Sequence, residues 1–142
     1  MRVQFLFALI GVLALPAWAG PTVEVYKTSS CGCCNKWIDH LKQNGFQVVT
    51  RDVEDVVPYK YRFGVPYGMG SCHTARVGGY TIEGHVPARD IKRLLSERPK
   101  GARGLAVPGM PHGSPGMEGF QKDPYEVTLF DGQGRTSAYA TY

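Results

Sequence analysis

Three cysteines within four residues constrain this chain more than any other feature of its sequence. They lie in the stretch SSCGCCNKW, Ser29 to Trp37. The preceding residues, Thr22 to Thr28, alternate between apolar and polar side chains and predict a β-strand. The following residues predict an amphipathic helix whose apolar face is Cys34, Trp37, Ile38 and Leu41. The cysteines are therefore expected at a strand–helix junction, where the helix dipole favours negatively charged groups such as thiolates.

The segments up to residue 99 predict an α/β domain. A second strand is expected at Phe46 to Val53 and a short helix at Pro58 to Phe63. The stretch SCHTARVGGYTIEGHV then predicts two strands that turn at Gly78–Gly79. A further helix is expected to begin at Pro87, which suits the first helical position. Its apolar face would be Ile91, Leu94 and Leu95. We therefore expect a thioredoxin-like sandwich with a βαβ-ββα core over residues 20–99.

The composition changes after residue 99. Residues 100–124 are rich in glycine and proline, show no periodic pattern and contain Met110, His112 and Met117. A segment of this length without regular structure is more often functional or disordered than a plain connector. Residues 125–142 alternate again around the turn Asp131 to Gly134, and they predict a C-terminal β-hairpin packed on the core.

The N-terminus has the features of a secretory signal peptide. Arg2 precedes the apolar run Val3 to Leu15, and Ala17-Trp18-Ala19 is a small-residue cleavage pattern. The run is shorter than the roughly 20 apolar residues of a spanning helix. We therefore expect residues 1–19 to be removed, and no later segment is apolar enough to span a membrane.

Charge and cysteine content narrow the function classes. The formal net charge is +4, one unit of which belongs to Arg2, and no long Lys/Arg run is present, so nucleic-acid binding is not indicated. Export would place the four cysteines in a compartment where disulfides persist. Three cysteines packed so tightly, however, do not resemble the spread framework of a disulfide scaffold.

The cysteine spacing leaves three kinds of chemistry open. Cys31 and Cys34 form a C-x-x-C, which a thiol–disulfide oxidoreductase uses, but Cys33 is then surplus. A metal site uses all three, because soft thiolates select Cu(I), Zn²⁺ or iron–sulfur centres. Structural zinc sites favour two separated cysteine pairs, so adjacent cysteines fit bridged Cu(I) better. A pair of structural disulfides is the third alternative.

A fourth cysteine extends the metal interpretation. Cys72 begins a predicted strand that would lie beside the cysteine loop in a thioredoxin-like sheet. Such an arrangement would bring four thiolates into one cluster, formed by Cys31, Cys33, Cys34 and Cys72. His73 is adjacent, although regular strand alternation would send its side chain to the other face.

Other histidines and methionines are weaker candidate ligands. Met110, His112 and Met117 carry plausible copper donors on a glycine-rich loop, although the methionines can equally serve in packing. Met69 is a similarly weak candidate ligand. We expect His85 in a turn or cap and His40 as a helix residue at least partly exposed to solvent.

Three stretches resemble one known family. They are SSCGCCNKW, GVPYGMGSCHTARVGGYTIEGHVPARDIKRLL and GLAVPGMPHGSPGME, and together they span nearly all of Thr22 to Glu118. These stretches resemble the motifs of the periplasmic CopG-type copper-resistance family, long catalogued as a metal-binding domain of unknown function. The resemblance implies a thioredoxin-like fold and a cysteine-bridged copper cluster. The family's motif cysteines map onto Cys31, Cys33, Cys34 and Cys72.

The expected function is therefore a periplasmic copper-binding protein for copper resistance, holding several Cu(I) ions. The resemblance also implies redox conversion between Cu(I) and Cu(II), as in a copper oxidoreductase. Copper ions and other periplasmic copper-handling proteins are the expected partners. The alternative is a thiol–disulfide oxidoreductase that uses Cys31 and Cys34.

Overall fold

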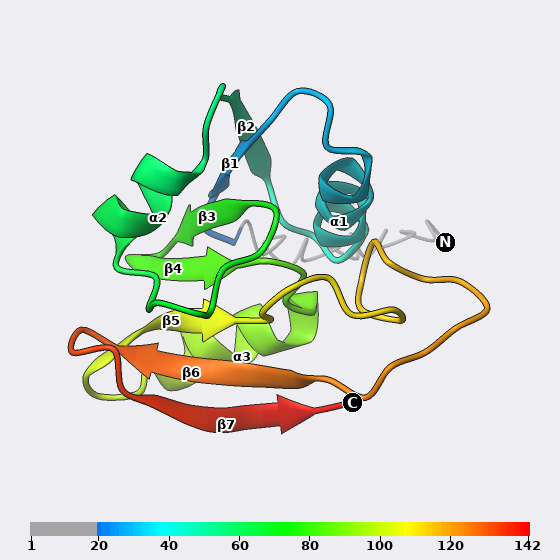
Figure 1. Ribbon diagram of the computed structural model, residues 1–142. Coiled ribbons are helices and arrows are strands. Elements are labelled where there is room, and N and C mark those ends of the chain that lie inside the picture. Colours follow the sequence, from blue (N-terminus) through cyan, green and yellow to red (C-terminus); the bar gives the residue numbers. More distant parts are fainter. Residues whose placement is uncertain (1–19) are drawn as a thin grey trace, which may run out of the picture.

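The computed structural model describes residues 20–142, so the predicted signal peptide, residues 1–19, lies outside the described residues. The described chain forms one seven-stranded sheet with three helices (Figure 1). The strands are β1 (Val23–Lys27), β2 (Val48–Asp52), β3 (Thr74–Val77), β4 (Tyr80–Glu83), β5 (Ala102–Ala106), β6 (Glu126–Asp131) and β7 (Thr136–Thr141). The helices are α1 (Gly32–Gln43), α2 (Val57–Phe63) and α3 (Ala88–Glu97).

The strand order in the sheet is β2-β1-β3-β4-β5-β6-β7. The β1–β2 and β4–β5 pairs are parallel, each joined through a helix, and the other pairs are antiparallel. The first two strands pair in parallel, and the predicted hairpin at Gly78–Gly79 is confirmed. Both hairpin glycines have positive φ, which glycine adopts without steric penalty.

One row of apolar side chains across the sheet forms the centre of the core. Val25, Ala75, Ile82 and Leu105 are neighbours in the strand register and are fully buried. The buried face of α1 is the predicted set of Cys34, Trp37, Ile38 and Leu41. Because α1 and α3 contribute to the same apolar cluster, they cover one face of the sheet. On the opposite face, Tyr26 of β1 stacks against Tyr59 of α2 at 4.5 Å between ring centroids.

The main departure from the sequence prediction is β5. It lies inside residues 100–124, which we expected to lack regular structure. The strand forms because Leu105 and Val107 bury their side chains in the core, while Gly104 fits closely against the Thr81 carbonyl of β4. A side chain at position 104 would collide with that carbonyl, so glycine here permits strand pairing rather than flexibility.

The predicted C-terminal hairpin is confirmed as β6–β7, and its position is now specified. It extends the central sheet through pairing of β6 with β5. Val127 and Phe130 of β6 are fully buried. At the start of α3, Pro87 is the cap residue and Ala88 the first helical residue, one position later than predicted. Within residues 20–142, no helix is long and apolar enough to cross a membrane.

Candidate metal centre

The N-terminus of α1 presents three cysteines at the end of β1. Cys31 is the residue before the helix, and Cys33 and Cys34 lie in its first turn. Cys31 and Cys34 are joined by a disulfide, whereas Cys33 and Cys72 are free thiols. Cys34 is fully buried and the other three are partly exposed. The structure thus describes the oxidised form of the C-x-x-C pair.

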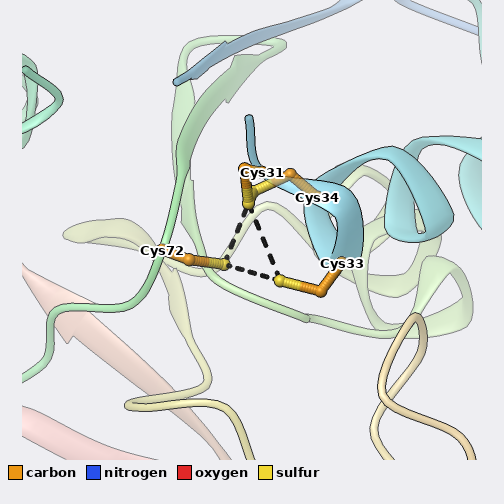
Figure 2. Close-up of side chains that lie close together, drawn as sticks. All are labelled: Cys31, Cys33, Cys34 and Cys72. Carbon is orange, nitrogen blue, oxygen red and sulfur yellow. Dashed lines mark hydrogen bonds between the residues drawn. A yellow bond between two sulfur atoms is a disulfide. The ribbon is translucent and has the colours of Figure 1, made fainter. Parts of the chain in front are cut away.

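Cys72 completes a cluster of four cysteines (Figure 2). Its Sγ lies 3.8 Å from Cys33 Sγ and 3.6 Å from Cys34 Sγ. Cys31 Sγ lies 3.6 Å from Cys33 Sγ. All four sulfurs fall within 4.8 Å of one another. The convergence expected from the sequence is therefore present, and we call Cys31, Cys33, Cys34 and Cys72 the four-cysteine cluster.

The segment that carries Cys72 is held by a buried ion pair and by the later loop. The Ser71 N–H donates to Glu83 Oε1 at 2.7 Å, and Lys60 Nζ donates to the same oxygen. The Ser71 hydroxyl donates to the Gly109 carbonyl, while the Gly109 N–H donates to the Gly70 carbonyl at 3.1 Å. These bonds connect Cys72 to the loop that contains Met110.

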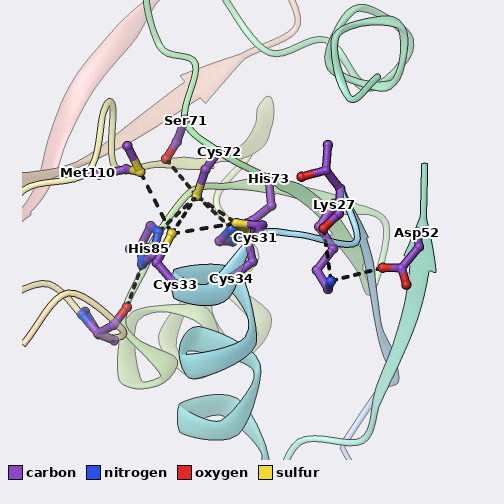
Figure 3. Close-up of a disulfide and its surroundings, with 12 residues drawn as sticks. Lys27, Cys31, Cys33, Cys34, Asp52, Ser71, Cys72, His73, His85 and Met110 are labelled. Atoms are coloured by element: carbon purple, nitrogen blue, oxygen red, sulfur yellow. Dashed lines mark hydrogen bonds and ion pairs between the residues drawn. A yellow bond between two sulfur atoms is a disulfide. The ribbon is translucent and has the colours of Figure 1, made fainter. Parts of the chain in front are cut away.

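Two histidines face Cys72, which corrects the expectation for His73. His73 Nδ1 lies 3.4 Å and His85 Nε2 lies 3.1 Å from Cys72 Sγ (Figure 3). We expected His73 on the opposite face of a strand, but Cys72 lies in a bend before β3, so strand alternation does not apply. His85 lies in the bend between β4 and α3, as expected for a turn residue. Its Nδ1 donates to the Pro115 carbonyl at 2.7 Å and directs Nε2 toward Cys72, a contact that we did not expect.

Both imidazoles are fully buried and their orientations are fixed by packing. The His73 ring lies against Trp37, with 4.3 Å between ring centroids, and 5.2 Å from the His85 ring. The indole N–H of Trp37 donates to the Val86 carbonyl at 2.9 Å, which holds the loop after β4 against α1. His73 Nε2 is buried without a hydrogen-bond partner among residues 20–142. Such a nitrogen is unusual in a folded protein.

Burial dominates the electrostatics of the centre. It raises the pKa of the Cys72 thiol to about 11, with a further contribution from the neighbouring Cys33. Burial also lowers the pKa of His85. It lowers the pKa of His73 well below the ordinary value, and repulsion from His85 and Lys60 lowers that pKa further. Neutral imidazoles are the form that binds metal ions.

The three candidate ligands on the loop, Met110, His112 and Met117, differ in their position relative to the four-cysteine cluster. Met110 Sδ lies 3.9 Å from Cys33 Sγ. The exposed His112 instead bonds through Nδ1 to Asp123 Oδ2 at 2.9 Å. Met117 takes part in backbone hydrogen bonds to Gly113 and Ser114. Of the three, Met110 alone makes a sulfur contact with the cysteines in the described part of the chain.

Gly116 and Pro115 contact the centre, and sequence reasoning missed both. At Gly116, φ is +91°, and a Cβ would approach the Cys33 carbonyl and the Trp37 N–H to 2.9 Å and His85 Nδ1 to 3.2 Å. The loop therefore lies directly on the first turn of α1. The glycine-proline pattern GSPGM was the available signal, but it does not specify which element the loop contacts.

The centre offers two overlapping sets of metal donors. The first is the four-cysteine cluster, and the second is Cys72, His73 and His85, which we call the Cys–His group. Within each set all donor atoms lie within 4.8 Å of one another. Thiolate and imidazole are the ligands that copper and zinc prefer in proteins, so the residues present fit a soft or borderline metal ion.

The fold and this centre together define an α/β protein with a cysteine-rich candidate metal site at the N-terminus of a helix. Two solved structures, described as copper resistance protein CopG in forms 2 and 1, match the chain at 46% identity. Each match covers 87% of this chain and 98% of the other, with TM-scores of 0.82 and 0.81. The chain belongs to the CopG family of copper resistance proteins.

Two further comparisons complete this result. Residues 69–117 match the family described as a protein of unknown function, DUF411, and this segment includes Cys72, His73, His85 and Met110. No curated protein matches the chain. The family resemblance expected from the sequence is confirmed.

Proposed function

We propose that this protein binds several Cu(I) ions in the four-cysteine cluster and thereby serves copper resistance. The observation that carries the proposal is the convergence of four sulfurs within 4.8 Å at the N-terminus of α1. Thiolates so close together repel one another unless cations lie between them. Cu(I) is a soft ion that thiolates select, and adjacent cysteines are suited to bridge neighbouring ions.

Loading of all four cysteines requires reduction of the Cys31–Cys34 disulfide. A dithiol reductant would supply two electrons and two protons, leaving two thiols and its own disulfide. Cys31 and Cys34 would then join Cys33 and Cys72, and each thiol would lose its proton on binding Cu(I). Metal loading is therefore linked to the thiol redox state.

The experiment is an anaerobic titration of the reduced mature protein with Cu(I), followed by a metal count. We expect more than one copper ion per chain in the unaltered protein, and clearly fewer bound copper ions in Cys33→Ser and in Cys72→Ser. His112→Ala is the matched control, because this exposed histidine is paired with Asp123 away from the sulfurs. Absence of Cu(I) binding, or unchanged stoichiometry in both cysteine variants, would reject the proposal.

A thiol–disulfide oxidoreductase is the second candidate, and the Cys31–Cys34 disulfide favours it. In this case the protein would exchange disulfides with a thiol substrate in the absence of metal. Cys33→Ser would leave turnover nearly unchanged, whereas Cys31→Ser would abolish it. Rapid disulfide exchange by the metal-free protein, together with failure of the reduced protein to bind Cu(I), would favour this function over copper binding.

We further propose a thioredoxin-like core, supported by the order β2-β1-β3-β4 and by the cysteine motif at the N-terminus of α1. The division into residues 1–19, 20–99, 100–124 and 125–142 remains our domain proposal. We expect the protein to act in the periplasm after signal cleavage, to exchange copper with other copper-handling proteins there, and to interconvert Cu(I) and Cu(II).

A further inference from the structure

We propose that the form with the Cys31–Cys34 disulfide binds a single Cu(II) ion through the Cys–His group, Cys72, His73 and His85. This inference rests on the proposed copper-binding function and assigns it a second state of the same centre. The disulfide removes Cys31 and Cys34 from the ligands. The donors that remain nearest to Cys72 Sγ are two imidazole nitrogens, at 3.1 and 3.4 Å, while the free thiol of Cys33 lies farther away at 3.8 Å. A different set of ligands therefore takes over when the pair is oxidised.

The geometry of the Cys–His group is close to that of a metal site. With bond lengths of about 2.3 Å to sulfur and 2.0 Å to nitrogen, tetrahedral ligands lie about 3.5 Å apart. The sulfur of Cys72 lies 3.4 Å from His73 Nδ1 and 3.1 Å from His85 Nε2. The two sulfur–nitrogen distances therefore need to lengthen by only a few tenths of an ångström to admit an ion.

The surroundings hold His85 in the orientation that a ligand requires. Its Nδ1–H donates to the Pro115 carbonyl, so the lone pair of Nε2 faces Cys72. A backbone carbonyl on the second nitrogen is the usual outer partner of a metal-binding histidine. Gly116 allows this carbonyl to reach His85, because its lack of a side chain lets the loop lie on α1.

His73 is preorganised by packing rather than by hydrogen bonding. Its ring lies against Trp37 and is fully buried, with Nδ1 toward Cys72. Its Nε2 has no partner among residues 20–142. A buried imidazole that leaves one nitrogen unpaired forgoes hydrogen-bond energy. Nδ1, which faces Cys72 at 3.4 Å, is the nitrogen available to a metal ion.

The donor type points to Cu(II). Two histidines and one cysteine, with a weak and distant thioether, are the ligands of mononuclear copper sites that cycle between Cu(I) and Cu(II). Met110 is placed at the edge of the centre, with Sδ 3.9 Å from Cys33 Sγ. Because Cys72 belongs to both donor sets, the four-cysteine cluster and the Cys–His group cannot be filled independently.

The test uses the mature protein with the disulfide intact and Cys33→Ser, which prevents Cu(II) from oxidising the Cys33–Cys72 pair. Cu(II) is added and followed by electron paramagnetic resonance and by absorbance. We expect one Cu(II) per chain, couplings from two nitrogens and a thiolate-to-copper absorption band. His85→Gln should remove one nitrogen coupling and weaken binding at least about tenfold, and Cys72→Ser should remove the band. His112→Ala should leave the spectra unchanged.

Three results would overturn the inference. They are no stoichiometric Cu(II) in the disulfide form, a spectrum insensitive to Cys72→Ser, or nitrogen couplings that disappear in His112→Ala. Cys72 is partly exposed and its serine variant keeps the test decisive if His85→Gln does not fold. Cu(I) loading of the reduced protein separates the two proposals. If that loading succeeds while Cu(II) binding fails, the copper function stands and this inference alone is rejected.

Discussion

The four cysteines differ in their readiness to react, because one pair is joined and the other is free. The thiolate is the reactive form of cysteine, and burial raises the pKa of Cys72 to about 11. We therefore predict that iodoacetamide modifies two sites per chain in the oxidised, metal-free protein. Cys33 should react faster than Cys72, whose thiol stays protonated at neutral pH.

Mass spectrometry of digested protein over a time course measures this difference. Reduction in denaturant, which also exposes the buried Cys34, should raise the total to four modified cysteines and serves as the internal control. Equal rates at Cys33 and Cys72 would contradict the assigned environment of Cys72. Labelling at Cys31 before reduction would contradict the disulfide.

Gly116 tests whether contact between the loop and α1 supports the metal centre. Alanine at position 116 combines a strained positive φ with close approach to the Cys33 carbonyl and the Trp37 N–H. We predict that Gly116→Ala lowers the free energy of unfolding by about 1–3 kcal/mol and weakens copper binding. Gly109→Ala is the matched control, since φ is also positive there but a Cβ meets nothing within 4 Å.

Urea unfolding and Cu(I) competition titrations measure both effects. Because the two substitutions share the backbone strain, the difference between them isolates the contact. If Gly109→Ala impairs copper binding as strongly as Gly116→Ala, the contact with α1 does not explain the effect.

At the scale of single residues, sequence reasoning located the four cysteines, misplaced His73 and missed the contact of His85 with Cys72. The cysteines were predictable because their spacing and the order of strands limit where they can lie. His73 was misplaced because strand alternation was applied one residue before the strand begins. His85 was missed because its role depends on Pro115, a contact between residues far apart in sequence that no local pattern encodes.

Among the elements, α2 and β4 determine the position of Cys72 through a buried ion pair. Glu83 is fully buried, and its Oε1 accepts hydrogen bonds from Lys60 and from the Ser71 N–H. Burial raises the pKa of Glu83, and the Lys60 ammonium opposes that shift. The pair thus joins a short helix, a central strand and the segment before Cys72.

We predict that Lys60→Met lowers the free energy of unfolding by roughly 3–5 kcal/mol, because it leaves a buried carboxylate without its partner. The double variant Lys60→Met/Glu83→Gln should recover part of the loss. Since an unpaired Glu83 is more easily protonated, the loss should be larger at pH 8 than at pH 5. Guanidinium unfolding at both pH values measures these differences.

The exposed pair of Arg51 and Glu24 provides the matched control. Arg51→Met should change the unfolding free energy much less, since solvent screens that pair. A loss of equal size in Arg51→Met and Lys60→Met would show that burial of Glu83 is not the cause. A double variant less stable than Lys60→Met would show that the unpaired charge is not the source of the loss.

Element boundaries were largely predictable where local signals agree. The apolar spacing of α1 and the turn at Gly78–Gly79 are examples. The strand β5 was not, because its short sequence ARGLA lacks alternation and pairs only through contacts with β4 and β6. Its stability comes from tertiary neighbours, which override weak local propensity.

For the molecule as a whole, the C-terminal hairpin is part of the main sheet rather than a separate layer. β6 covers the edge of β5, and the ring of Tyr142 stacks on Tyr125 at 4.9 Å between centroids. The Tyr142 hydroxyl donates to Asp90 of α3 at 2.6 Å. The sequence predicted the hairpin itself, but its register against β5 depends on Val127 and Phe130 finding the core.

The stability of the metal-free protein should fall as the pH decreases from 7 to 5. Burial lowers the pKa of His40, His73 and His85 below the ordinary value of 6.5. Above pH 6.5 these histidines are neutral in both states and stability is fully present. Below it the unfolded chain binds protons that the folded chain does not, so stability is lost until the pH reaches the folded-state pKa values. Each histidine contributes a slope of at most about 1.4 kcal/mol per pH unit.

Urea unfolding of the oxidised, metal-free protein between pH 8 and pH 5 measures this slope. The raised pKa of Glu83 acts in the opposite direction, since protonation of that buried carboxyl favours the folded state. A single-site comparison therefore isolates the histidine contribution. His40 Nε2 accepts the Ala88 N–H at 3.0 Å at the start of α3, and the amide oxygen in His40→Gln can replace this acceptor without titrating. We expect a shallower slope in His40→Gln, and a slope equal to that of the unaltered protein would exclude His40 as a source of acid sensitivity.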